Sequence, residues 1–91
     1  MTATGMDRIR AILDLAGQDI LGEMDNITDP VARQEAAREV NETLLPALVA
    51  EVKAHRAETV AGLREGRTLA QVGELLGGTS IARVDQILKG R

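Results

Sequence analysis

The chain has 91 residues, eleven Lys or Arg against fourteen Asp or Glu, one His, and no Cys, Phe, Tyr or Trp. Without cysteine there is neither a disulfide framework nor a thiolate metal site, and one histidine cannot form a metal cluster, so we expect no metal and no cofactor. The lack of aromatic residues removes the base-stacking surfaces of single-strand binders and leaves an aliphatic core suited to packed helices. No apolar run approaches the roughly 20 residues that span a bilayer and no signal peptide is visible, so we expect a cytoplasmic protein with no membrane partner.

Charge is distributed unevenly along the sequence. Residues 1–63 carry six Lys or Arg against eleven Asp or Glu, whereas residues 64–91 carry five against three. The C-terminal part is therefore net +2 and the rest is net −5. This asymmetry indicates a C-terminal part that approaches phosphate and an N-terminal part with another role.

The first two predicted helices follow from periodicity and capping residues. Apolar residues recur with helical spacing over residues 6–24, which predicts the first helix. Asp29 is a natural N-cap for the second, and Pro30 suits its first position because the missing N–H has no partner there. The predicted inner face of this second helix consists of Val31, Ala36, Ala37, Val40 and Leu44.

Pro46 interrupts the helical pattern. In a continuous helix its ring would clash with the carbonyl of Glu42, so we expect a bend or a new start, and Thr43 could cap such a start. The third helix then runs to about Glu65, and Gly66 ends it. Its predicted inner face consists of Leu48, Val49, Val52, Val60, Ala61 and Leu63.

The end of the chain predicts two short helices. Thr68 caps the sequence LAQVGELL, which ends at Gly77 and Gly78, and Ser80 or Thr79 caps the sequence that follows. In this last helix the residues expected to face inward are Ile81, Val84, Ile87 and Leu88. Because no segment alternates with period two, the predicted fold class is all-α, with about five helices.

Two short helices joined by glycines are typical of a helix-turn-helix. Gly73 provides the small residue where the helices approach, and Gly77 or Gly78 provides the positive φ of the turn. The predicted miniature core consists of Leu69, Val72, Leu76, Val84 and Ile87. The outward residues of the last helix suit the base edges and phosphates of a major groove. These outward residues are Thr79, Ser80, Ala82, Arg83, Gln86 and Lys89.

The segment TLAQVGELLGGTSIARVDQIL, residues 68–88, resembles the last helix-turn-helix of primary sigma factors. It is still more similar to a family of small actinobacterial regulators, in which helices like TDPVAR and LPALVAEVKAHRAETVAGLREG precede the motif, as at residues 28–33 and 45–66 here. The resemblance covers residues 28–91 and implies sequence-specific binding of double-stranded DNA. In the sigma-like pattern the turn glycine lies six positions before the buried aliphatic residue of the recognition helix. Gly78 and Val84 keep that interval, whereas Gly77 does not, so the turn is one residue longer, with Gly77 as the insertion or as the helix cap. Ile81 falls where a polar contact residue is common, and we expect it to pack inward.

Individual contacts can be assigned on this basis. Arg83 and Gln86 are candidates to read bases, because Arg pairs with guanine and Gln with adenine, although both could be ordinary solvated residues. Ser80 and Thr79 can donate to phosphate, cap the helix, or do both. We expect Asp85 to pair locally with Arg83 or Lys89. The predicted DNA-binding residues are Arg67, Thr68, Thr79, Ser80, Ala82, Arg83, Gln86 and Lys89.

The sequence thus predicts a transcriptional regulator and no enzyme, since no nucleophile or pocket-forming sequence accompanies the carboxylates. Residues 1–63 form a helical dimerisation or scaffold region, whose first helix fills the monomer core or forms a dimer seam, and residues 64–91 form the DNA-binding region. One small helix-turn-helix binds weakly, so we expect a homodimer that reads a partly palindromic operator through residues 80–89 and is nucleoid-associated when bound. The alternative is a protein-interaction module (a sigma-factor mimic, antitoxin or phage adaptor) whose acidic half binds a basic partner.

Overall fold

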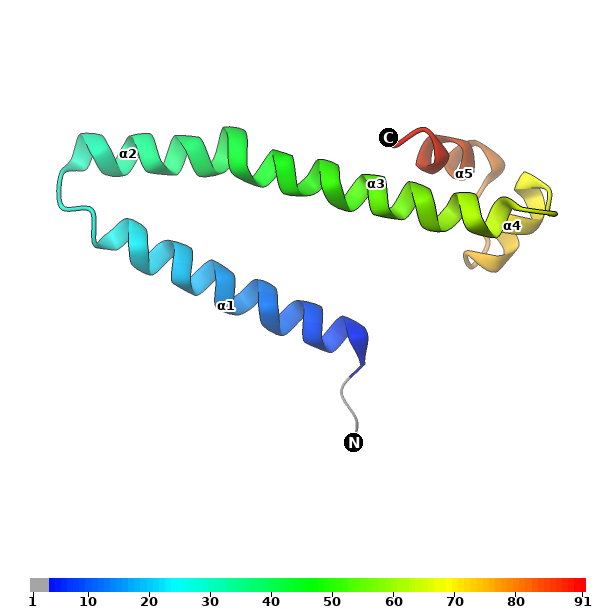
Figure 1. Ribbon diagram of the computed structural model, residues 1–91, viewed down its shortest axis with the longest axis horizontal. Coiled ribbons are helices and arrows are strands. Elements are labelled where there is room, and N and C mark those ends of the chain that lie inside the picture. Colours follow the sequence, from blue (N-terminus) through cyan, green and yellow to red (C-terminus); the bar gives the residue numbers. More distant parts are fainter. Residues whose placement is uncertain (1–3) are drawn as a thin grey trace. The chain divides into compact units, whose positions relative to one another are not determined.

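The computed structural model describes residues 4–91, and all regular structure in this range is helical. The elements, shown in Figure 1, are α1 (Gly5–Asp25), α2 (Pro30–Glu39), a π-helical turn η1 (Val40–Leu44), α3 (Leu45–Arg64), α4 (Leu69–Leu75) and α5 (Ile81–Leu88). The all-α prediction is confirmed. Two compact units make up the chain: an N-terminal unit, Met1–Glu42, and a C-terminal unit, Thr43–Arg91.

A capping box starts α1. The Thr4 hydroxyl accepts a hydrogen bond from the Asp7 amide at 3.1 Å, and the Asp7 carboxylate accepts one from the Thr4 amide at 3.1 Å. The backbone hydrogen bond from Thr4 holds the pKa of the Asp7 carboxyl below its ordinary value, because it stabilises the charged form. The helix therefore begins at Gly5, one residue before the predicted start.

Helices α1 and α2 contact each other, yet neither contains a fully buried residue. Asp29 caps α2 as predicted, since its carboxylate accepts from the Ala32 amide at 3.0 Å and Pro30 follows it. The prediction that Val31 and Leu44 face inward is wrong, because these side chains are 70% and 53% exposed. The partly buried residues of the two helices and their connection are Ala16, Gly17, Met24, Ile27, Ala36 and Ala37.

Of the bend or new start expected near Pro46, the new start with Thr43 as its cap is wrong. Helical backbone continues through the π turn, and Leu44 enters α3 in a right-handed helical conformation with no side-chain cap, so Thr43 does not cap it. The physical reason is the missing N–H of Pro46, which cannot bond the carbonyl of Glu42. A wider turn just before the proline accommodates this gap without ending the helix.

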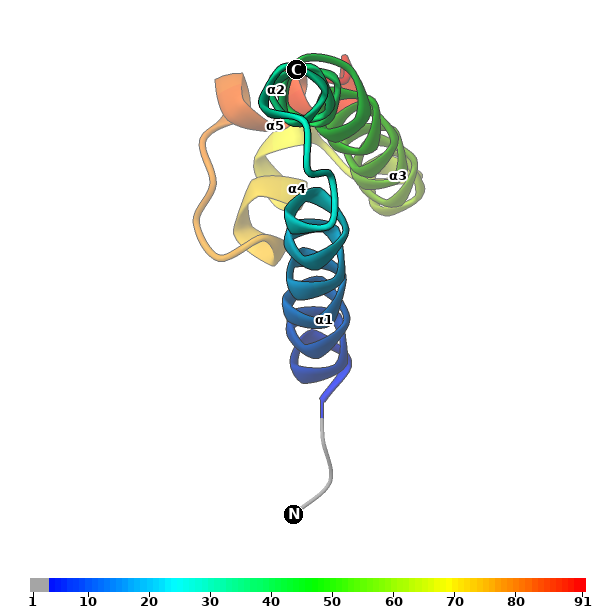
Figure 2. The same cartoon turned by 90° about the vertical axis from the view of Figure 1, so that its left-hand side faces the viewer.

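The core of the C-terminal unit lies where α3, α4 and α5 pack together, as seen in Figures 1 and 2. Its buried residues are Val60, Val72, Val84 and Ile87, with Leu63, Leu69, Leu76 and Leu88 packed against them. This confirms the predicted miniature core. The inward placement of Leu48, Val49 and Val52 is wrong, because these side chains are 48–59% exposed. Ala61 is exposed as well. The reason is that the buried part of α3 is limited to its C-terminal end, at Val60 and Leu63.

Candidate nucleic-acid interface

Two arginines close the C-terminal end of α3. The guanidinium of Arg64 donates to the carbonyl of Arg67, and Arg67 Nη1 donates to the carbonyl of Leu63 at 3.0 Å. Gly66 turns the chain between them with φ of 71°, as expected for the residue that ends this helix. Each exposed guanidinium uses one of its five donor hydrogens here, so others remain for a phosphate.

A reciprocal capping box positions α4. Thr68 Oγ1 accepts from the Gln71 amide at 3.1 Å, and Gln71 Oε1 accepts from the Thr68 amide at 2.8 Å. The prediction that Thr68 is the cap is confirmed. The role of Gln71 was not predicted from the sequence, although a Thr followed three residues later by Gln is a known signal of this motif.

The turn between α4 and α5 contacts α4 at Gly73. A Cβ atom at this buried position would lie 2.2 Å from the carbonyl oxygen of Thr79, so no larger residue fits without movement of the backbone. The carbonyl of Gly73 accepts from the amides of Gly78 and Thr79 at 3.0 and 2.9 Å. The predicted close approach at Gly73 is thus confirmed, and backbone hydrogen bonds hold the turn there.

The turn itself uses both glycines, where the sequence predicted one or the other. Gly77 has φ of 81° and Gly78 has φ of 89°, values that L side chains rarely adopt. The Thr79 hydroxyl, partly buried, donates to the carbonyl of Leu76 at 3.1 Å. This turn is the orange segment that arcs at the left of Figure 2.

Ser80, and not Thr79, caps α5. Its hydroxyl accepts from the Arg83 amide at 3.1 Å, and Ile81 is the first residue of the helix. The expectation that Ile81 packs inward is wrong, because its side chain is 53% exposed. The core covers α5 on the side of Val84 and Ile87, and leaves the first turn open.

The open side of α5 carries the predicted contact residues. Ala82, Arg83, Gln86 and Lys89 are all exposed. Arg83 Nη1 donates to Gln86 Oε1 at 3.4 Å, which places the two candidate base-reading side chains side by side. Lys89 Nζ lies 2.8 Å from Asp85 Oδ2, so the expected local pairing of Asp85 is made with Lys89.

The predicted site residues fall into two groups, apart from Thr79, which is partly buried and donates its hydroxyl to the Leu76 carbonyl within the turn, so it does not face outward as predicted. Ser80, Ala82, Arg83, Gln86 and Lys89 lie on α5 and at its two caps, whereas Arg67 and Thr68 precede α4. Within residues 4–91, no hydrogen bond or ion pair links the second group to α5.

A tether to α3 holds the residues after α5. Arg56 Nη2 donates to the carbonyl of Arg91 at 3.3 Å, and the Arg91 amide donates to the carbonyl of Gln86 at 2.9 Å. This role of Arg56 was not predicted, because no local pattern signals a contact between residues 35 positions apart.

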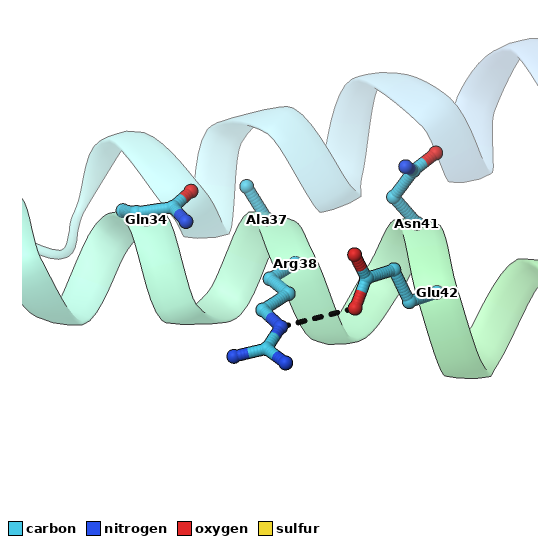
Figure 3. Close-up of a pocket in the computed structure, with 5 residues that line it drawn as sticks. All are labelled: Gln34, Ala37, Arg38, Asn41 and Glu42. Atoms are coloured by element: carbon cyan, nitrogen blue, oxygen red, sulfur yellow. Dashed lines mark hydrogen bonds and ion pairs between the residues drawn. The ribbon is translucent and has the colours of Figure 1, made fainter.

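The surface of α2 and η1 also contains polar side chains. A shallow depression on α2 and η1, shown in Figure 3, is lined by Gln34, Ala37, Arg38, Asn41 and Glu42. Arg38 and Glu42 form an ion pair there at 3.0 Å, and both of these side chains are exposed. Within residues 4–91 no three His, Asp or Glu side chains are grouped to hold a metal ion, and no helix is both long and apolar enough to cross a bilayer.

Comparison of the chain with protein-family models, curated proteins and solved structures finds no match.

Proposed function

We propose that the C-terminal unit binds double-stranded DNA as a helix-turn-helix, with α5 as the recognition helix. The observation that carries this proposal is the two-sided character of α5: Val84 and Ile87 anchor it in the core, while Arg83, Gln86 and Lys89 are exposed. Base reading requires side chains held on a rigid support. The Ser80 cap and the backbone contacts of Gly73 provide that support.

The exposed side chains suggest a division of roles. Arg83 matches the acceptors of guanine, and Gln86 matches the donor and acceptor of adenine. Ile81, at the first turn of α5, adds an apolar surface suited to the methyl group of thymine. The N-terminal amides of α5, together with Arg67, suit phosphate, which would fix the protein on the duplex without reading its sequence.

The biological role that fits such binding is transcriptional regulation, without enzymatic activity. One helix of this length contacts few base pairs, so affinity and specificity are best served by two copies on a partly palindromic operator. Recognition helices in such dimers lie about 34 Å apart on one face of the duplex. We therefore expect bound sites to show two similar half-sites.

The test is a binding titration against a library of genomic DNA fragments, followed by sequencing of the bound fraction. Arg83→Ala should abolish the preference at one base position, at a cost of roughly 1–3 kcal/mol for the preferred sequence. Arg67→Ala should weaken all sequences alike and reduce the salt dependence of binding by about one ion. Because Arg67 also bonds α3, unfolding of each variant is measured alongside.

Two further variants sharpen the titration. Arg38→Ala removes an exposed arginine from α2 and should leave binding unchanged. Asp85→Asn removes a negative charge beside the reading surface and releases Lys89, so it should strengthen binding. Unchanged binding in Arg83→Ala, Arg67→Ala and Asp85→Asn together would refute this surface. Failure of the wild type to bind any duplex, with co-purification of one basic protein, would favour a protein-interaction module.

A further inference from the structure

Helix α1 carries apolar residues on a wider arc than one neighbouring helix covers. Six of its large apolar side chains are more than half exposed, and Ile12 and Leu15 are 67% and 61% exposed. The partly buried residues of α1 are Ala16, Gly17 and Met24. At 3.6 residues per turn, Leu15 lies on the opposite side of the helix from Gly17 and Met24, and Ile12 lies between Leu15 and Ala16. Residues 4–42 leave the side of Ile12 and Leu15 exposed.

The uncovered side forms a regular seam. Its residues alternate in spacing between three and four, so they lie along one side of the helix, with two apolar residues at the centre. The seam residues are Gly5, Arg8, Ile12, Leu15, Asp19 and Gly22. All of them are exposed, and a Cβ atom at either glycine would meet no other atom within 4 Å.

The order of residue types along the seam reads the same from both ends, except that charge changes sign. From the N-terminus it is glycine, positive, apolar, apolar, negative, glycine. Two copies laid antiparallel would place Gly5 opposite Gly22, Arg8 opposite Asp19, and Ile12 opposite Leu15. Two copies laid parallel would place Arg8 against Arg8 and Asp19 against Asp19, which like-charge repulsion disfavours.

We infer that this seam is an interface with a second copy of the same chain, in which the two α1 helices pack antiparallel about a two-fold axis. Self-complementary charge is what an isologous contact requires, because each residue pair then occurs twice. Contact with a partner of different sequence does not require α1 to be complementary to itself. The seam is short, so the dimer is weak and forms in the micromolar range. The inference does not rest on DNA binding, since it concerns the N-terminal unit.

Charge reversal tests the inference by sedimentation equilibrium over a range of chain concentrations. Arg8→Glu places two carboxylates together at both ends of the seam, and Asp19→Arg places two guanidinium groups together. Each variant alone should weaken self-association by about tenfold, because two favourable pairs become repulsive. An equimolar mixture of the two variants should associate again, because the carboxylate introduced by Arg8→Glu then meets the guanidinium introduced by Asp19→Arg.

Matched controls reverse the same charges away from the seam. Arg10→Glu and Asp14→Arg lie on other sides of α1 and should leave association unchanged, alone or mixed. Circular dichroism confirms that all of the variants remain helical. A wild-type chain that stays monomeric up to about 100 µM would overturn the inference and indicate cover from within the chain. Association that the seam variants do not weaken, or that mixing them does not restore, would overturn the antiparallel seam.

Discussion

At the scale of single residues, Gly73 is the position where side-chain size decides whether α4 and α5 can meet. The turn approaches so closely that the Thr79 carbonyl occupies the place of a Cβ atom. In addition, both Gly78 and Thr79 donate their amides to the Gly73 carbonyl, so the turn cannot move away without loss of two hydrogen bonds. Gly73 is therefore constrained twice: its side must remain free of a Cβ atom, and its carbonyl holds the turn through two hydrogen bonds.

Gly73→Ala should lower the free energy of unfolding by roughly 2 kcal/mol, because the added methyl group overpacks rigid backbone. Gly62→Ala is the control: no atom lies within 4 Å of its added Cβ, and alanine is the better helix former. It should raise stability by up to about 1 kcal/mol. Urea titrations measure both. Equal effects of the two substitutions would contradict the close contact at Gly73.

At the scale of elements, capping residues decide where the short helices begin. Isolated helices as short as α4 and α5 are not stable in water, so their ends must be satisfied by side chains and their sides by the core. Thr68 with Gln71 caps α4, and Ser80 caps α5. The Ser80 cap of α5 also adjoins the proposed reading surface. Substitutions of Ser80 can therefore test its effect on folding stability and its effect on DNA binding separately.

Ser80→Ala should lower the free energy of unfolding by about 1 kcal/mol, because the Arg83 amide loses its acceptor. Ser80→Asp should retain stability, since a carboxylate is an equally good cap and suits the helix dipole. The same substitution should weaken DNA binding, because the new carboxylate repels phosphate. Thermal unfolding and duplex titration are measured on each variant. Full DNA affinity in Ser80→Asp would argue against phosphate near this helix end.

At the scale of the whole molecule, the two units differ in how their apolar residues are covered. The C-terminal unit has a buried core contributed by three helices, whereas neither helix of the N-terminal unit has a buried residue. The predicted division of roles at residue 63 remains a prediction. The structural division falls near residue 42, so α3 belongs with α4 and α5.

If a second copy covers α1, amide hydrogen exchange should depend on chain concentration in the N-terminal unit but not in the C-terminal unit. Amide hydrogen exchange in α1 should slow as chain concentration rises through the micromolar range, because association stabilises the state that associates. Exchange at Val72 and Val84 in the C-terminal core should not change. Hydrogen exchange followed by mass spectrometry measures both in one sample. A uniform response of the two units would argue against an interface confined to α1.

Local patterns in the sequence were sufficient for most of the helices, for the caps Asp29 and Thr68, and for the miniature core. Helical periodicity, Asp29–Pro30, Thr68 and the glycines that end helices all act through neighbours within a few residues, so the printed sequence already contains their partners. The same reasoning predicts that the candidate contact residues Arg83 and Gln86 are exposed, since the spacing of Val84 and Ile87 identifies the buried side of the helix.

Tertiary structure alone decided which apolar residues are covered. Val31, Leu48, Val52 and Ile81 have the spacing of core residues, yet they are exposed because no helix of their own unit lies over them. The same holds for the π turn that precedes Pro46 and for the tether from Arg56 to Arg91. Periodicity states that a helix has an apolar side; only the position of neighbouring helices determines whether that side is buried.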